Sequence, residues 1–234
     1  MALILCIETG TDICSVGLVN NGELLSLRES DSGRDHAKRV AVFVDELLRE
    51  NNLDPQALDA IAVGEGPGSY TGLRIGVSFA KGLCYGLNKP LIAISSLAAL
   101  TQVAIEDYQA GIVDIDDWKS ALLCPMIDAR RMEVYTAVYN TDGQQLTDVA
   151  AEVITEDSLA EWRNRTAEFV TFGSGSSKCA NILNAKLIDI TPSVRGMALL
   201  AEQKYNAGDF VDTAYFEPYY LKDFVVTTSR KKLF

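Results

Sequence analysis

The stretch that decides the fold spans residues 64–83 and reads GEGPGSYTGLRIGVSFAKGL. An apolar run at residues 60–63 comes directly before it and predicts a buried strand. The next five residues, GEGPG, include three glycines, which supply backbone angles that residues with a Cβ avoid. We therefore expect a tight turn after the strand. Ser69 or Thr71 can then cap a helix that continues to about residue 87.

Small residues recur at every fourth position of this stretch, at Gly68, Gly72, Gly76 and Ala80. Each glycine inside a helix costs about 1 kcal/mol relative to alanine, so this bare face indicates that a backbone or a ligand approaches it closely. The dinucleotide-binding pattern G-x-G-x-x-G does not fit, because its third glycine would fall at Ser69. A Rossmann domain is therefore not expected.

The same order of elements occurs twice along the chain. Three strands, a helix, a strand and the glycine turn follow one another within residues 3–68. A shift of 120 residues superposes Ile7-Glu8 on Ile127-Asp128, and a second G-x-G turn follows a later strand at Gly173-Ser174-Gly175. The sequence thus predicts a duplicated β-β-β-α-β-α unit. We expect one lobe over residues 1–108 and a second over residues 109–234.

Composition limits the classes of protein that fit this chain of 234 residues. Hydrophobic content of 48% and charged content of 23% are those of an ordinary globular protein. No apolar run approaches the roughly 20 residues of a membrane span. The five cysteines form no C-x-x-C pair, which is the pattern of reduced thiols, and we expect a cytoplasmic protein without membrane contact. A net charge of −11 disfavours unaided nucleic-acid binding, and the basic cluster Arg230-Lys231-Lys232 is interpreted as a solvated tail.

A duplicated unit with a carboxylate after each first strand resembles the actin, sugar-kinase and heat-shock-ATPase superfamily, whose members bind ATP between two lobes. Five strings occur in order and resemble one family closely: IETGTDICSVGL, GEGPGSYTGLRIGVSFAKGL, IDARRMEVYTAVY, FGSGSSK and EPYYLK. On these motifs the chain is similar, from end to end, to the TsaB (YeaZ) family of bacterial tRNA threonylcarbamoyladenosine synthesis. The resemblance implies a two-lobed α/β fold of the actin-like ATPase type (ASKHA, ribonuclease H-like).

Phosphoryl transfer in that superfamily needs carboxylates for Mg²⁺ and glycine loops for phosphates. Glu8, Thr9, Asp128, Gly173 and Gly175 stand at the matching positions and are interpreted as relic nucleotide-binding residues. The family usually has Asp where this chain has Glu8, and nothing in the chain resembles a general base near a γ-phosphate. No intrinsic cofactor is expected, and ATP or ADP would bind at low affinity or within a complex.

The resemblance also locates where a metal would bind in TsaD, the catalytic paralogue of TsaB. The H-x-x-x-H helix of TsaD falls here at Ser96 and Leu100, and neither side chain is a useful metal ligand. His36 is the only histidine, which leaves the serines and cysteines without a nearby base in the sequence. We therefore expect neither a metal site nor catalytic residues.

A helical surface remains as the candidate site. The helix that follows residue 35 has an apolar side, and the glycine-rich helix is apolar nearly all round, so we expect a second buried face. In TsaB the corresponding helices contact TsaD, as the resemblance implies. The expected interface residues are His36, Val40, Phe43, Leu47, Gly68, Gly72, Leu73, Gly76 and Ala80.

These expectations combine in a non-catalytic partner subunit of TsaD. With TsaD and TsaE it would support transfer of a threonylcarbamoyl group to the adenosine beside the anticodon of tRNAs that read ANN codons, with tRNA bound only through the complex. Alone, its apolar surface would form a two-fold homodimer. Two alternatives stay open: a free-standing ATP-dependent kinase or hydrolase of the same fold, and a protease.

Overall fold

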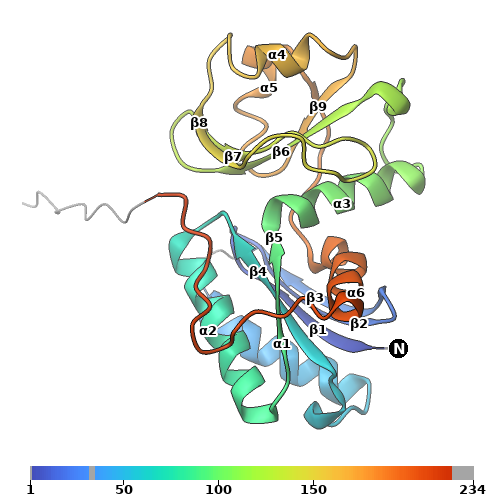
Figure 1. Cartoon of the computed structure of the whole chain (residues 1–234), viewed down its shortest axis with the longest axis vertical. Helices are drawn as coiled ribbons and strands as arrows, with labels where there is room; N and C mark the ends of the chain where they lie inside the picture. The colour runs from blue at the N-terminus through green and yellow to red at the C-terminus, as the bar shows by residue number, and fades with distance from the viewer. Residues whose placement is uncertain (1, 32–34, 223–234) are drawn as a thin grey trace, which may run out of the picture.

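The computed structural model describes residues 2–31 and 35–222, which form two α/β lobes, one above the other in Figure 1. The basic cluster Arg230-Lys231-Lys232 lies outside the described residues. The first lobe contains the strands β1 (Leu3–Glu8), β2 (Cys14–Asn20), β3 (Glu23–Ser30), β4 (Ala60–Gly66) and β5 (Leu91–Ser95). The second lobe contains β6 (Leu122–Asp128), β7 (Glu133–Thr136), β8 (Ala150–Val153), β9 (Phe169–Phe172) and β10 (Lys186–Leu187).

The two sheets have the same strand order and the same strand directions. The orders are β3-β2-β1-β4-β5 and, read from the matching edge, β8-β7-β6-β9-β10. In each sheet the first three strands are antiparallel, and the fourth and fifth run parallel to the first. The predicted duplication and the two-lobed actin-like α/β fold are therefore confirmed.

Helices cover both faces of the first sheet because its strands alternate side chains between two apolar layers. One layer includes Leu5, Ile7 and Val63, which pack against α1 (His36–Glu50) and α2 (Tyr70–Leu87). The opposite layer includes Ile4 and Cys6, which pack against η3 (Val194–Met197) and α6 (Ala198–Ala207). A short turn of 3₁₀ helix, η1 (Pro55–Ala57), precedes β4.

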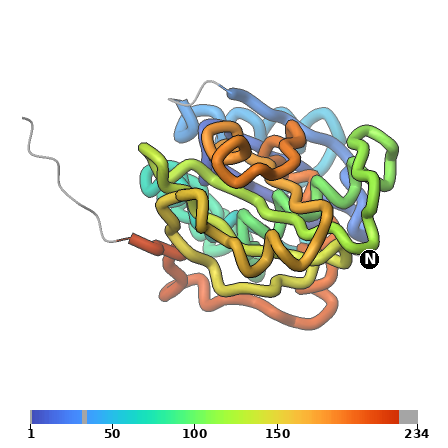
Figure 2. Tube along the Cα trace, turned by 90° about the horizontal axis from the view of Figure 1, so that it is seen from above, coloured from blue at the N-terminus to red at the C-terminus, as the bar shows by residue number. Residues whose placement is uncertain are grey.

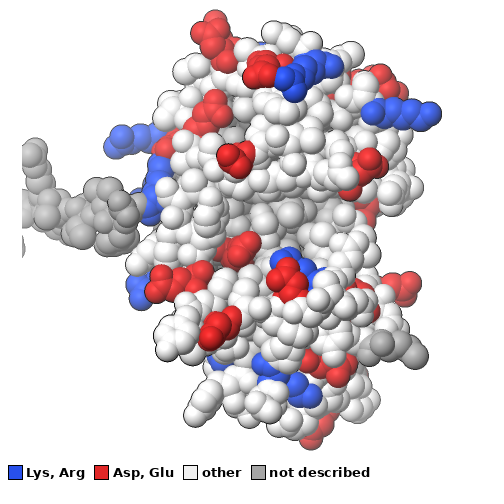
Figure 3. All heavy atoms as spheres, viewed as in Figure 1, with Lys and Arg blue, Asp and Glu red and all other residues white. Residues whose placement is uncertain are grey.

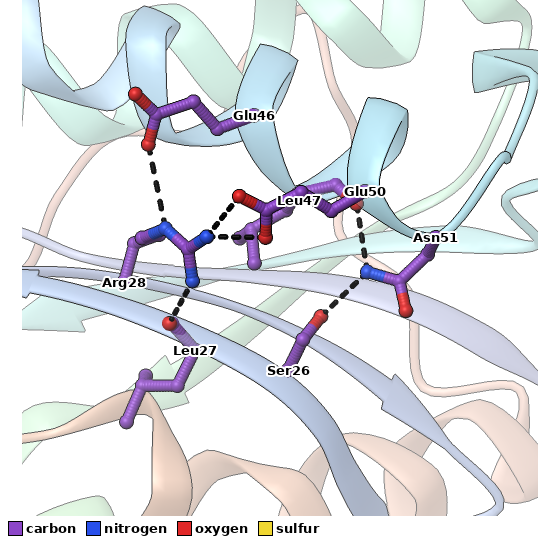
Figure 4. Close-up of polar contacts among 7 residues, drawn as sticks. All are labelled: Ser26, Leu27, Arg28, Glu46, Leu47, Glu50 and Asn51. Atoms are coloured by element: carbon purple, nitrogen blue, oxygen red, sulfur yellow. Dashed lines mark hydrogen bonds and ion pairs between the residues drawn. The ribbon is translucent and has the colours of Figure 1, made fainter.

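Polar contacts hold α1 onto the edge strand β3 (Figure 4). Arg28 on β3 pairs with Glu46 at 3.3 Å and also with Glu50 of α1. At the end of the helix, the Asn51 side chain donates to Ser26 Oγ at 3.0 Å. These contacts tie α1 to β3, in addition to the apolar residues of α1 that pack on the sheet.

One helix, α3 (Ser96–Gln109), lies between the lobes (Figure 1). Its Leu97, Leu100 and Val103 join the core of the second lobe, whereas Ala99 joins the core of the first. Arg195 of η3 forms a two-point ion pair with Asp107 of α3. The lobes therefore share a packed helix, and only part of the contact between them is open to ligands.

The second lobe has much shorter helices than the first. They are η2 (Trp118–Ser120), α4 (Ala160–Arg163) and α5 (Ala180–Leu183). Within residues 2–31 and 35–222, none of the helices is long and apolar enough to cross a membrane.

The C-terminal part of the chain returns to the first lobe. After α6, the C-terminal strap (residues 211–222) runs along one side of the molecule (Figure 2). Val211 N donates to Leu91 O at 2.9 Å, and Tyr219 N donates to Glu65 O at 2.8 Å. Lys222, at the end of the strap, pairs with Glu133 of the second lobe. The expected division at residue 108 thus differs from the structure, because η3, α6 and most of the strap pack against the first lobe.

Candidate functional site

The glycine face of α2 contacts the chain's own backbone. A Cβ at Gly72 would lie 2.0 Å from Thr9 O, and one at Gly68 would lie 2.2 Å from Gly10 O. The Thr9 hydroxyl donates to Gly72 O at 2.8 Å, and Ser69 N donates to Gly10 O at 2.6 Å. The glycines therefore let α2 lie directly on the loop that follows β1. The expectation that this face meets another chain is wrong.

The other expected interface residues also point inward. Val40 and Leu47 of α1 are 0% exposed, and Phe43 is 7% exposed, because they cover the sheet. His36 is buried, with its Nε2 2.7 Å from Thr11 O. Leu73, Gly76 and Ala80 of α2 are buried as well. These residues therefore lie on the inner faces of the two helices, and a docking surface on α1 and α2 would have to use their outer faces.

The outer faces of the same helices form an open groove, which we call the α1–α2 groove. Its volume is about 620 Å³, and it is lined by Ala37, Tyr70, Thr71, Arg74, Ile75, Ser78 and Phe79. Ile75 and Phe79 are one helical turn apart and only partly buried. Tyr85, farther along α2, is 90% exposed. Apolar side chains on the outer side of a helix that already covers a sheet are typical of a docking surface.

A second cavity, the inter-lobe cleft, has a volume of about 510 Å³. The first lobe contributes residues 10–12 and 68–71, and the second contributes residues 127–130, Tyr135 and Ser174, with Lys222 from the strap. Of the five predicted relic residues only Asp128 lines this cleft. In the second G-x-G turn it is the middle residue, Ser174, that faces it.

Glu8 is buried and serves the packing of the first lobe. Its carboxylate accepts hydrogen bonds from Gly10 N at 2.6 Å and from Ser96 Oγ at 2.7 Å. A Cβ at Gly64 would lie 2.2 Å from the same carboxylate. Burial raises the pKa of Glu8, and the hydrogen bonds from Ser96 and Gly10 partly oppose this shift. The longer arm of glutamate therefore ends inside the lobe rather than at the cleft.

Asp128 is exposed, but its carboxylate already has partners. It pairs with Lys178 and accepts a hydrogen bond from Arg130 N at 3.0 Å. The Lys178 ammonium also donates to Arg131 O at 2.6 Å and to Glu133 O at 2.9 Å. These contacts hold the loop between β6 and β7. A cation bound at Asp128 would have to compete with the ammonium of Lys178.

The two positions that match the TsaD metal motif, and the five cysteines, lie in the core. The Ser96 hydroxyl donates to Glu8, and Leu100 is buried, so neither side chain presents a metal ligand. Within residues 2–31 and 35–222, no group of three or more His, Cys, Asp or Glu side chains is arranged to hold a metal ion. The five cysteines are free and buried, and burial raises the pKa of Cys6 and Cys124 to about 12. Such thiols stay protonated and are poor nucleophiles.

The chain is similar to known proteins both in sequence and in structure. The model of the family described as "TsaD: tRNA N6-adenosine threonylcarbamoyltransferase" matches residues 30–169. A Haemophilus influenzae protein named tRNA threonylcarbamoyladenosine biosynthesis protein TsaB is 32% identical over 94% of this chain and 93% of its own length. The Escherichia coli protein of the same name is 30% identical over 94% of both chains. The solved structure of YeaZ from Pseudomonas aeruginosa superposes with a TM-score of 0.79 at 28% identity, covering 94% of this chain and 100% of that one.

Proposed function

The chain belongs to the TsaB (YeaZ) family of tRNA threonylcarbamoyladenosine biosynthesis proteins, and we propose that it acts there as a non-catalytic subunit that binds TsaD. TsaD is the threonylcarbamoyltransferase, and TsaE completes the assembly. In this proposal the present chain supports TsaD while the threonylcarbamoyl group is transferred to the adenosine beside the anticodon of ANN-reading tRNAs.

The α1–α2 groove is the observation that carries the proposal. It is open, mostly apolar and formed by two long helices, and a similar pair of helices in a partner could complete a four-helix contact. A stable contact of this kind buries at least about 1,000 Å². In the absence of TsaD, the same surface could pair with a second copy of this chain as a two-fold homodimer.

The residues at the superfamily's catalytic positions support a non-catalytic role. Glu8 is enclosed by Gly10 and Ser96, and Asp128 is engaged by Lys178. Nucleotide phosphates and Mg²⁺ would therefore gain few ligands from these side chains. We propose that the chain needs no cofactor of its own and that ATP or ADP binds weakly to it alone.

A charge placed in the groove tests the proposal. Ser78 is exposed on α2 and lines the groove, so Ser78→Arg should leave the fold intact. An arginine buried without a partner should weaken the complex with TsaD at least about tenfold. Gln203→Arg is the matched control, because Gln203 is exposed on α6, on the opposite side of the sheet. Calorimetric titration of TsaD from the same organism into each folded variant measures the affinities.

Equal affinities of the Ser78→Arg and Gln203→Arg proteins for TsaD would contradict the docking surface. Failure of the unaltered chain to bind TsaD would contradict the proposed function itself. Rapid ATP turnover by the unaltered chain, without TsaD, would favour the kinase or hydrolase alternative.

A further inference from the structure

Basic side chains gather where the second lobe meets α2, on a protein whose net charge is −11 (Figure 3). We call the group Arg130, Arg131 and Lys222 the basic rim. Arg130 and Lys222 line the inter-lobe cleft beside Tyr70. Two separate parts of the chain, the loop between β6 and β7 and the strap, therefore bring cations to one edge of the molecule.

The loop between β6 and β7 is built to present two arginines outward. Arg130 and Arg131 have φ angles of 72° and 52°, a left-handed conformation that side chains other than Gly and Asn seldom adopt. The Asp128 carboxylate and the Lys178 ammonium hold the backbone of this loop, as described above. Both arginine side chains are exposed. Arginine at positions 130 and 131 is therefore less favourable for the backbone than asparagine or glycine would be.

The carboxylates around the rim are largely neutralised by lysines rather than by these arginines. Asp128 pairs with Lys178, and Glu133 pairs with Lys222, which leaves Asp12 as the remaining acidic residue that lines the cleft. Among the described residues, no acidic side chain lies within ion-pair distance of Arg130 or Arg131. Within that part of the chain, these two guanidinium groups have no acidic partner that a phosphate would have to displace.

Aromatic rings and a helix N-terminus lie beside these cations. The strap places Tyr220 against Tyr70, with ring centroids 4.9 Å apart, at the start of α2. The first turn of a long helix attracts phosphate, and Ser69 and Thr71 add hydroxyl groups there. Cations that follow a backbone, interleaved with aromatic rings, are the features by which proteins bind single-stranded nucleic acid.

We propose that the basic rim binds the RNA backbone of the tRNA anticodon arm once the chain is in its complex with TsaD. This inference rests on the proposed function. The overall negative charge of the chain explains why the rim would not bind RNA tightly by itself, whereas a partner can supply the remaining contacts. In this arrangement Arg130 and Arg131 contact phosphates of the RNA backbone.

The double variant Arg130→Asn/Arg131→Asn tests the proposal, because asparagine accepts the left-handed backbone while both charges are lost. The matched control is Arg165→Asn/Lys186→Asn. These cations lie near the beginning of β9, which pairs with the beginning of β6, whereas Arg130 follows the end of β6. Fluorescence anisotropy with a labelled anticodon stem-loop of an ANN-reading tRNA measures the affinity of each complex with TsaD at several salt concentrations.

Loss of two phosphate contacts should weaken RNA binding by roughly fivefold per contact at 0.1 M salt, or about 25-fold for both. The slope of log affinity against log salt should become shallower by about 1.4, and the control complex should match the unaltered one. Ultraviolet crosslinking followed by mass spectrometry should place RNA on peptides that contain the rim.

Affinity for the TsaD partner is measured first, so that the two hypotheses can fail separately. Unchanged RNA affinity in an intact variant complex would overturn the rim proposal and leave the proposed function standing. A variant that loses TsaD itself would identify the rim as a protein-binding surface and would also overturn the RNA proposal. Absence of TsaD binding by the unaltered chain would refute the proposed function instead.

Discussion

Alanine substitutions at two glycines of the same helix should change stability in opposite directions. At Gly72 a new Cβ would lie 2.0 Å from the backbone oxygen of Thr9, whereas at Gly82 it would meet no atom within 4 Å. Real Cβ contacts are almost never shorter than 3.0 Å, so the Gly72→Ala protein must move the loop after β1 by at least 3.0 − 2.0 = 1.0 Å. That loop also carries the Thr9 hydroxyl that donates to Gly72 O.

The magnitudes follow from helix propensity and packing. Replacing glycine by alanine in an exposed helix contributes up to about 1 kcal/mol, so Gly82→Ala should raise the melting temperature by about 2–4 °C. Overpacking costs about 1–3 kcal/mol and sometimes more, and a fixed backbone atom places Gly72→Ala at the upper end. After the propensity gain, a net loss of about 2 kcal/mol remains, which corresponds to a fall of about 4–8 °C.

Thermal melting and urea unfolding of both variants, followed by far-ultraviolet circular dichroism, measure these differences. If Gly72→Ala were as stable as Gly82→Ala, α2 would not lie directly on the loop after β1. A Gly72→Ala protein that keeps its stability but loses TsaD would restore the glycine face as an intermolecular surface.

Two further perturbations test the interior of the first lobe and its junction with the second. Because burial raises the pKa of Glu8 above its unfolded value of 4.5, its stabilising contribution is complete below about pH 4.5 and is lost as pH rises through the folded pKa. Relative to Glu8→Gln, the free energy of unfolding of the unaltered protein should therefore fall as pH rises above 4.5. Parallel pH profiles of the two proteins in urea unfolding would show that Glu8 does not titrate in this way. Arg195→Met leaves the buried Asp107 carboxylate without its ion-pair partner and should cost about 1–3 kcal/mol in urea unfolding. Loss of the exposed Arg49 pair in Arg49→Met should cost less than about 1 kcal/mol, and equal effects would argue against a special role for the α3–η3 pair.

Much of the fold was predictable from local patterns. The alternating strands of residues 3–28 and the carboxylates after Ile7 and Ile127 predicted two copies of one unit, and both sheets confirm it. These patterns are readable because a strand end or a turn depends on neighbouring residues. The return of α6 to the first sheet was missed, since its contacts are with strands more than 100 residues earlier in the chain.

The candidate site was only partly predictable. The sequence predicted an interface on two helices, but the most apolar residues of α1, such as Val40 and Leu47, cover the chain's own sheet. On α2 the groove is lined by Ile75 and Phe79, each of which comes one residue before a buried position, Gly76 or Ala80. The spacing of four between these two apolar residues was the sequence feature that could have predicted the groove. The bare stripe at Gly68, Gly72 and Gly76 correctly indicated close approach. It did not identify the neighbouring atoms, which are the backbone of residues 9 and 10.

The sequence by itself determined the duplicated α/β architecture and the family. It also determined that Ser96 and Leu100 stand at the two positions where the TsaD motif has histidines. These features depend on residue type and on short-range spacing. Only the tertiary structure decided which side of α1 and of α2 is exposed. It also showed that the Glu8 carboxylate is buried against Ser96 and that Lys178 forms an ion pair with Asp128. The tertiary structure also brought Arg130 and Lys222 to one edge, although they are far apart in the chain. The physical reason is that burial and charge pairing depend on long-range contacts, which exist only after the sheets and helices have packed.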